Sequence, residues 1–178
     1  VGPLARVAVG YAAGDRAIRE MVDGLLGHFK AGPEVLFSVL GRHAARALCA
    51  LHIARNLESW VLQLKPGEPA YVEYEIPEEG QGVGIVDAAR GALGHWVIVK
   101  DRKIAKYQCV VPTTWNASPR DDMGNPGPIE QALIGTRVKD EDNPFEIVRI
   151  VRSFDPCIAC AVHLLNHKGR ELRRYIIA

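Results

Sequence analysis

The chain has 178 residues, of which 48% are hydrophobic and 24% charged, so it is long enough to bury a core and has an ordinary globular composition. Its formal net charge of +1 gives no sign of a nucleic-acid partner. The apolar runs are far shorter than a membrane span, and no secretory signal peptide is recognised. Because the first residue is Val1 rather than Met, we expect a fragment of a longer protein.

Two helices are predicted in the first third of the chain. Residues 14–30 carry apolar side chains at helical spacing. A longer pattern of the same kind runs from 34 to 63 and stops before the breaker pair Pro66-Gly67. We expect these segments to form an antiparallel helix pair joined at Gly32-Pro33.

The middle of the chain predicts strands. Residues 71–76 alternate and are rich in strand formers, and residues 95–100 and 104–111 should pair as a hairpin about 101–103. Pairing should end at Pro112, which has no N–H to donate, and the residues around it should form a loop.

Two short helices are predicted near 128–134 and 144–154, each with a proline in its first turn. No repeat, low-complexity segment or domain linker is recognised. The predicted fold class is therefore α+β, mainly helical with a small antiparallel β element.

The four cysteines are too few for a secreted fold held by disulfides. Two form a C-x-x-C motif close to the C-terminus, and one stands alone in a predicted helix, where we expect it in the core. The cysteines are Cys49, Cys109, Cys157 and Cys160.

The motif is predicted to begin a helix. Asp155 is a good N-cap and Pro156 a good first helical residue, so Cys157, Cys160 and His163 should share one helical face. A helix N-terminus favours the thiolate, the form of cysteine that binds soft metals.

Metal binding is one of three interpretations of this motif. A thioredoxin-like redox pair is another, although it is typical of a βαβ context that is absent here. Two inert buried cysteines are the third. If the metal were structural zinc, Cys109 could be a fourth ligand beside Cys157, Cys160 and His163.

Several segments resemble nickel–iron hydrogenase large subunits. Residues 155–163 resemble the family's C-terminal D-P-C-x-x-C-x-x-H signature, residues 89–96 its arginine segment, and residues 107–116 the loop that closes over the iron. Residues 1–6 are also similar to a family segment. The resemblance spans essentially the whole chain, is closest to the membrane-associated uptake type, and implies the large-subunit hydrogenase fold.

The resemblance implies two metal sites. Cys157 would be a terminal nickel ligand and Cys160 would bridge nickel and iron, with carbon monoxide and cyanide also bound to the iron. His163 would ligate a separate magnesium (or iron) ion, helped by the backbone carbonyl of Cys109.

It also implies roles for five residues around the nickel–iron centre. Arg90 would sit over the metals with Asp155 as the carboxylate beside it. Pro112 and Thr113 would line the pocket of the diatomic ligands, with the Thr113 hydroxyl donating to cyanide. Ala89, where the family often has proline, would border a cyanide through its backbone.

The implied activity is reversible oxidation of dihydrogen to protons and electrons. Splitting dihydrogen needs a Lewis acid and a base, which a thiolate-held metal pair can supply. Because an arginine with a pKa above ~12 rarely gives up its proton, an electrostatic role is favoured for Arg90.

The implied partners are a small iron–sulfur subunit that receives the electrons, the missing N-terminal half of the large subunit with the other metal-binding cysteines, a maturation endopeptidase and a membrane cytochrome b. The implied location is membrane-associated, on the periplasmic side through the small subunit. Residues 1–163 would be the C-terminal part of the large subunit. Residues 164–178 would be an extension removed on maturation, and the fragment alone should be inactive.

Two other classes remain open. A non-catalytic relative, such as the homologous respiratory NADH dehydrogenase subunit, generally lacks the metal-binding cysteines, so Cys157 and Cys160 argue against it. The other is a small zinc-binding module, which metal analysis would distinguish.

Overall fold

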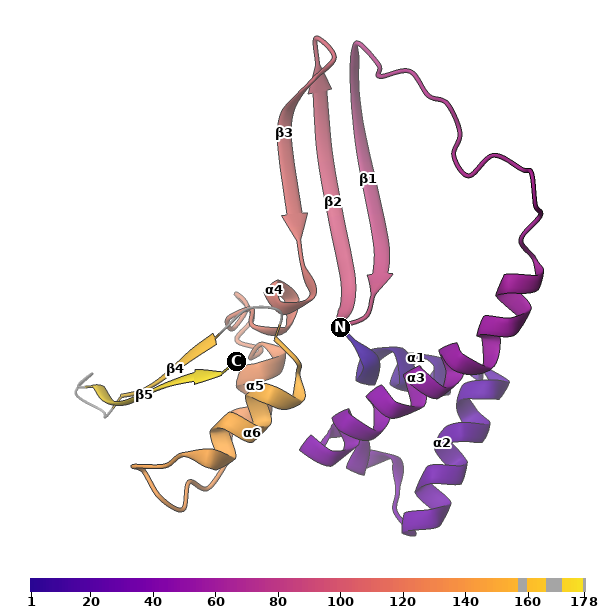
Figure 1. Ribbon diagram of the computed structural model, residues 1–178. Coiled ribbons are helices and arrows are strands. Elements are labelled where there is room, and N and C mark those ends of the chain that lie inside the picture. Colours follow the sequence, from indigo (N-terminus) through magenta and orange to yellow (C-terminus); the bar gives the residue numbers. More distant parts are fainter. Residues whose placement is uncertain (157–159, 166–170, 178) are drawn as a thin grey trace.

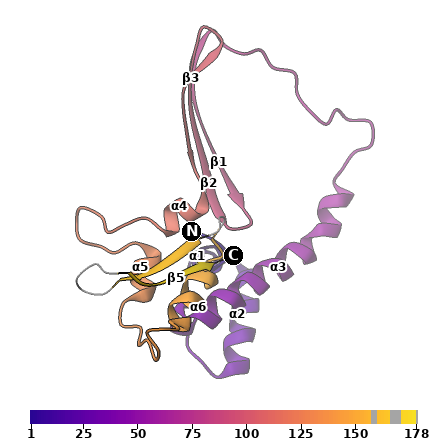
Figure 2. The ribbon, with the colours of Figure 1, turned by 60° about the vertical axis from the view of Figure 1, so that its left-hand side comes forward.

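The computed structural model describes residues 1–156, 160–165 and 171–177, the last two ranges as backbone only. Helices gather at one end of the molecule, and a narrow three-stranded sheet extends away from them (Figure 1). A second view shows the same separation of sheet and helices (Figure 2). The predicted α+β class, mainly helical with a small antiparallel sheet, is confirmed.

The N-terminal helices pack around the hydrophobic core. They are α1 (Pro3–Ala13), α2 (Arg16–Phe29), the 3-10 helix η1 (Pro33–Phe37) and α3 (Val39–Leu62). Asp15 caps α2 by accepting from the Ile18 amide, and Ser38 caps α3 by accepting from the Gly41 amide. The core side chains are Val7, Ile18, Met21, Val22, Leu26, Leu36, Ala45 and Cys49.

Two details of this region differ from the sequence prediction. Helix α1 was not predicted, and the helix expected from 34 to 63 is interrupted, because Ser38 ends η1 and caps a new helix. The expectation that Cys49 is a core residue is confirmed, since it is 5% exposed and its thiol donates to the Pro3 carbonyl oxygen.

The sheet has the order β1-β2-β3 and is antiparallel throughout. Its strands are β1 (Glu79–Ala88), β2 (Gly91–Lys100) and β3 (Lys103–Val110). The predicted hairpin is confirmed, and both residues of its turn, Asp101 and Arg102, have positive φ, as tight hairpin turns require. The strand predicted at 71–76 is wrong: the segment is an exposed connection, and alternation alone makes no strand without a partner to pair with.

Three short helices follow the sheet: α4 (Pro112–Asn116), α5 (Pro128–Leu133) and α6 (Phe145–Ser153). Strand pairing ends at Val110, before Pro112, as predicted. The loop expected after it is instead the single helical turn α4, because proline suits the first helical position.

The helix predicted over the C-x-x-C motif is wrong. Helix α6 ends at Ser153, Asp155 has a left-handed φ of 53° and not the extended backbone typical of an N-cap, and Cys160 begins strand β4 (Cys160–Leu165). Strand β4 pairs with β5 (Glu171–Ile177), whose β-branched and aromatic residues favour a strand. Cys160 and His163 therefore lie on a strand and not on the predicted helical face, and Cys157 lies outside the described residues.

Candidate functional site

The β1–β2 turn that carries Arg90 lies against the start of α1. A Cβ built on Gly91, whose φ is +130°, would come within 2.6 Å of the Gly2 nitrogen. A Cβ on Gly2, whose φ is +115°, would come within 2.9 Å of the Arg90 carbonyl oxygen. Both the close approach and the backbone conformation therefore require glycine at these two positions.

Arg6 fastens the same turn from α1. Its Nε donates to the Asp87 carboxylate at 2.6 Å, and its Nη2 donates to the Ala88 carbonyl oxygen at 3.1 Å. The hydrogen bond to Asp87 raises the pKa of the Arg6 guanidinium above its ordinary value, although burial opposes the shift. The backbone directly before Ala89 and Arg90 is thus held by a charged side chain.

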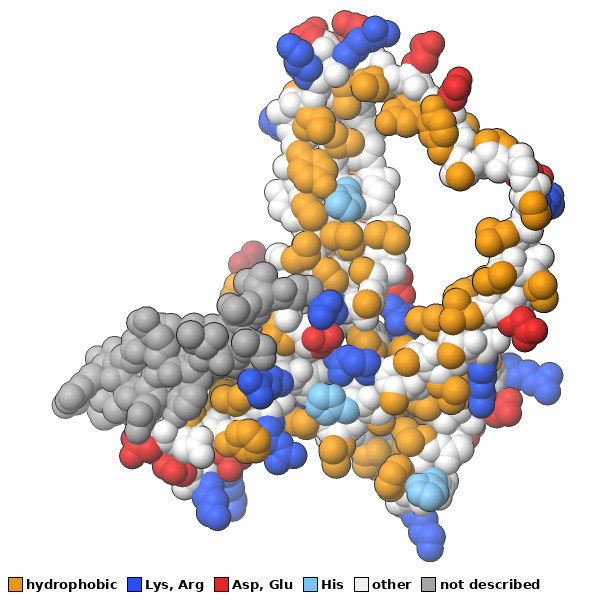
Figure 3. Space-filling view, in the orientation of Figure 1, with side chains coloured by type: hydrophobic (Ala, Val, Ile, Leu, Met, Phe, Trp, Pro, Cys, Tyr) orange, Lys and Arg blue, Asp and Glu red, His pale blue; other side chains and the backbone are white. Residues whose placement is uncertain are grey.

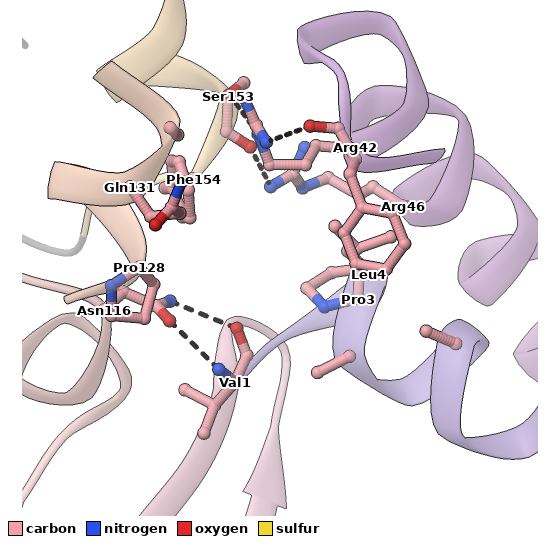
Figure 4. A pocket seen from close by; sticks show the side chains of 14 residues that line it. Val1, Pro3, Leu4, Arg42, Arg46, Asn116, Pro128, Gln131, Ser153 and Phe154 are labelled. Carbon is pink, nitrogen blue, oxygen red and sulfur yellow. Dashed lines mark hydrogen bonds between the residues drawn. The ribbon is translucent and has the colours of Figure 1, made fainter. Parts of the chain in front are cut away.

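Helix α4 is tied to the first residue of the chain. The buried Asn116 side chain accepts from the Val1 nitrogen at 3.0 Å and donates to the Val1 carbonyl oxygen at 3.1 Å (Figure 4). These two hydrogen bonds hold α4, which begins with the buried Pro112 and continues with Thr113, against Val1. Val1 directly precedes Gly2, the glycine that contacts the turn carrying Arg90.

Arg90 and Asp155, which are far apart in sequence, form an ion pair. The Arg90 Nε lies 3.2 Å from the Asp155 Oδ2, and the two side chains remain 45% and 40% exposed. A second arginine, Arg46 on α3, places its Nε 3.9 Å from the same oxygen. Arg90 and Asp155, both singled out from the sequence, are therefore direct neighbours. Asp155 lies two residues before Cys157 in the chain.

The structure places the other predicted metal ligands in the two strands β3 and β4. Cys160 and His163 are placed in β4 by their backbone only, and Cys109 is an exposed thiol near the end of β3. Within residues 1–156, 160–165 and 171–177, no group of three or more His, Cys, Asp or Glu residues could hold a metal. Two thiolates suit a soft metal in kind, but a closed site would need ligands from elsewhere.

A cavity of about 500 Å³ lies between α1, α3 and the α4–α6 region (Figure 4). Its polar lining comes mainly from Arg42, Arg46, Asn116 and Ser153. Neither Arg90 nor Asp155 lines this cavity, but Arg46, which lies beside Asp155, does.

Sequence reasoning missed the residues that position this pair. Arg46 contacts a distant segment and no local motif marks it, whereas Arg6 and Asn116 lie in segments with family resemblance but were not singled out there. For Arg6 the available signal was a single charged residue in an otherwise apolar segment, where it needs a partner.

The family model described as nickel-dependent hydrogenase matches residues 1–163. The uptake hydrogenase large subunit of Azotobacter chroococcum mcd 1 is 44% identical over 98% of this chain and 32% of its own length. The periplasmic [NiFeSe] hydrogenase large subunit of Desulfomicrobium baculatum is 44% identical over 96% of this chain and 34% of its own length.

Solved structures agree with these sequence matches. A Dm. baculatum [NiFeSe]-hydrogenase structure superposes with a TM-score of 0.66 at 50% identity, covering 70% of this chain and 25% of that chain. A Desulfovibrio vulgaris Hildenborough [NiFeSe] hydrogenase variant gives a TM-score of 0.72 at 39% identity, covering 88% and 34%.

With a family match over nearly its whole length, this chain belongs to the nickel-dependent hydrogenase family. Its relatives are large subunits, and the resemblance drawn from the sequence motifs is confirmed at that level. The chain spans about a third of the length of these curated relatives.

Proposed function

We propose that this chain is part of the large subunit of a nickel–iron hydrogenase that oxidises dihydrogen reversibly and passes the electrons to a small iron–sulfur subunit. The observation that carries the proposal is the 3.2 Å contact between Arg90 and Asp155. It joins the arginine segment to the residues directly before the C-x-x-C motif, so two separate hydrogenase-like segments meet at one place.

The thiolates of Cys157 and Cys160 would hold the metals together with cysteines from the rest of the large subunit. Cys157 would bind nickel, and Cys160 would bridge nickel and an iron that also carries carbon monoxide and cyanide. When bound, the metal pair would supply the Lewis acid, and its thiolates the base, that heterolytic splitting of dihydrogen requires.

The remaining residues of this chain would shape the surroundings of that centre. Arg90 keeps a permanent positive charge, because arginine stays protonated in proteins, and its half-exposed guanidinium can still face a bound group. Pro112 is buried at the start of α4, where it would exclude water from the diatomic-ligand pocket. The Thr113 hydroxyl would donate to a cyanide, and the backbone of Ala89 would border a cyanide.

A second metal ion, magnesium or iron, would be held by His163 and the Cys109 backbone carbonyl.

Residues 164–178 would be removed during maturation. Two observations support a boundary after His163. The family match ends at His163, and in the β4–β5 pair His163 lies opposite Arg174 of the tail. Removing the tail would uncover the edge of β4 for the rest of the large subunit.

The partners would be the small subunit, the N-terminal half of the large subunit, a maturation endopeptidase and a membrane cytochrome b. Exposed apolar side chains along the sheet and the far end of α3 support a covering partner (Figure 3). They include Leu57, Trp60, Leu62, Val83, Ile85 and Ile104.

We place the protein at the membrane on the periplasmic side, held there through its small subunit. Relatives include a quinone-reactive Ni/Fe-hydrogenase large chain of Wolinella succinogenes and the periplasmic subunit of D. baculatum. Among the described residues, no helix is both long and apolar enough to cross a membrane.

The test replaces each motif cysteine in the full-length subunit, produced together with its small subunit. Cys157→Ser and Cys160→Ser should each lose nickel and abolish hydrogen oxidation, because a hydroxyl is a hard and weakly acidic ligand. Cys49→Ser is the matched control, since Cys49 lies in the helical core and donates to the Pro3 carbonyl oxygen. Normal nickel content and near-normal turnover in either motif variant would contradict the proposal.

A further inference from the structure

Helix α3 directs two arginines, one turn apart, toward the C-terminal end of α6 (Figure 4). Arg42 donates from Nε to the Ser153 hydroxyl at 2.6 Å, and its guanidinium lies 4.5 Å from the centre of the Phe154 ring. Arg46 donates from Nη2 to the Ser153 carbonyl oxygen at 3.1 Å. Arg42 therefore contacts the side chains of this segment, whereas Arg46 contacts its backbone.

Arg46 also faces Asp155. Its Nε lies 3.9 Å from the Asp155 Oδ2, the oxygen that Arg90 contacts at 3.2 Å. The Arg46 Nε is shielded from solvent and forms no hydrogen bond within the part of the chain that the structure describes. A shielded donor is costly unless an acceptor compensates it, and this carboxylate is the charged acceptor in front of it.

The backbone of Asp155 turns sharply at the end of α6. Its φ of 53° is in the left-handed region, which aspartate adopts more readily than most residues other than glycine. Its amide donates to the Arg152 carbonyl oxygen at 2.9 Å, so the turn ends α6 and directs the chain toward Cys157. Arg46 holds this turn at both the Ser153 carbonyl and the Asp155 side chain.

We propose that Arg46 is a positioning residue of the hydrogenase site, an inference that rests on the function proposed above. By fixing the Asp155 carboxylate from the α3 side, it sets the direction in which the same carboxylate holds the Arg90 guanidinium. Besides its hydrogen bond to the Ser153 carbonyl oxygen, Arg46 reaches Arg90 through Asp155. Arg42, which contacts Ser153 and Phe154, supplies the packing of α6 instead.

The test is a double-mutant cycle in the full-length large subunit paired with its small subunit. Arg46→Gln should lower kcat by about tenfold to a hundredfold with nickel content unchanged, because small displacements of a positioned group are costly for turnover. Arg46→Lys should restore part of this loss. In an Asp155→Asn background, Arg46→Gln should cost nothing further, since coupled residues are not additive.

Arg42→Gln is the matched control on the same helix. It should lower the melting temperature, and its effect on kcat should multiply with that of Asp155→Asn, because its contacts are to other residues. If the effects of Arg46→Gln and Asp155→Asn multiply as well, Arg46 is merely structural and the inference is overturned.

A crystal structure of the Arg46→Gln protein gives a readout that does not depend on activity. The Arg90 Nε–Asp155 Oδ2 distance, now 3.2 Å, should open beyond about 4 Å, the limit of an ion pair. An unchanged distance overturns the inference. A wild-type protein without nickel would instead overturn the proposed function, and the crystallographic comparison would still decide the role of Arg46.

Discussion

Removal of the Ser153 hydroxyl should loosen the C-terminal end of α6. Ser153 is fully buried, and its Oγ accepts from Arg42 Nε at 2.6 Å while donating to the Ile150 carbonyl oxygen at 2.6 Å. Burial already lowers the pKa of the Arg42 guanidinium, which is only 7% exposed. Ser153→Ala would leave a charged donor in this site without its acceptor.

The expected cost follows from the charge of the donor. A hydrogen bond to a charged group contributes about 1.5–3 kcal/mol, and removing one partner strands the other. Since about 1.4 kcal/mol corresponds to a factor of ten, local opening of α6 should become about tenfold to a hundredfold more frequent. Amide hydrogen exchange in residues 148–153 of the full-length subunit measures this change.

Two variants make the experiment specific. Ser59→Ala is the control, because the exposed Ser59 hydroxyl donates only to the Asn56 carbonyl oxygen one turn earlier on α3. Arg42→Met combined with Ser153→Ala removes both partners and should recover part of the lost protection. Protection of α6 that changes by less than about twofold in Ser153→Ala would refute this reasoning.

The other predictions concern the site and the tail. Arg90→Lys should cut turnover at least about tenfold while nickel and iron content stay unchanged, because an ammonium cannot reproduce the donor fork of a guanidinium; metal content that falls together with activity would show a structural role. The 178-residue chain alone should lack hydrogenase activity, since it holds only half of the proposed ligands, and measurable hydrogen oxidation by it would contradict this. Mass spectrometry of the mature subunit should find a C-terminus at His163, whereas an active, nickel-loaded protein that still ends at Ala178 would exclude tail removal.

Apolar spacing and turn residues in the sequence predicted the β2–β3 hairpin and two of the helices. The hairpin around Asp101 and Arg102 follows from two β-prone runs and a short turn, α2 follows from apolar spacing, and α6 follows from the proline at its start. The helix break at Ser38 was missed because apolar spacing continues across it, although serine is a strong N-cap.

Strand pairing, present or absent, accounts for the wrong predictions. Asp155 and Pro156 look like a helix start, but Cys160–Leu165 pairs with Glu171–Ile177, the next strand along the chain, so this pairing overrides the signal for a helix. The alternating residues 71–76 fail for the opposite reason, because no strand pairs with them.

In the candidate site, the residues with a motif were predicted from the sequence, and the contacts between distant segments were not. Arg90 and Asp155 were found through motif resemblance, and the structure adds their contact. Arg6 lies in a segment noted for its resemblance, but its hydrogen bond to Ala88 could not be predicted, and neither could the hydrogen bond of Arg46 to Ser153, because only folding creates these contacts.

Metal analysis of the mature full-length large subunit, purified with its small subunit, tests the central claim most directly. The account predicts nickel and iron together in the wild-type protein, with nickel lost in Cys157→Ser. Zinc as the only bound metal would contradict it and would identify the C-x-x-C motif as part of a structural zinc site.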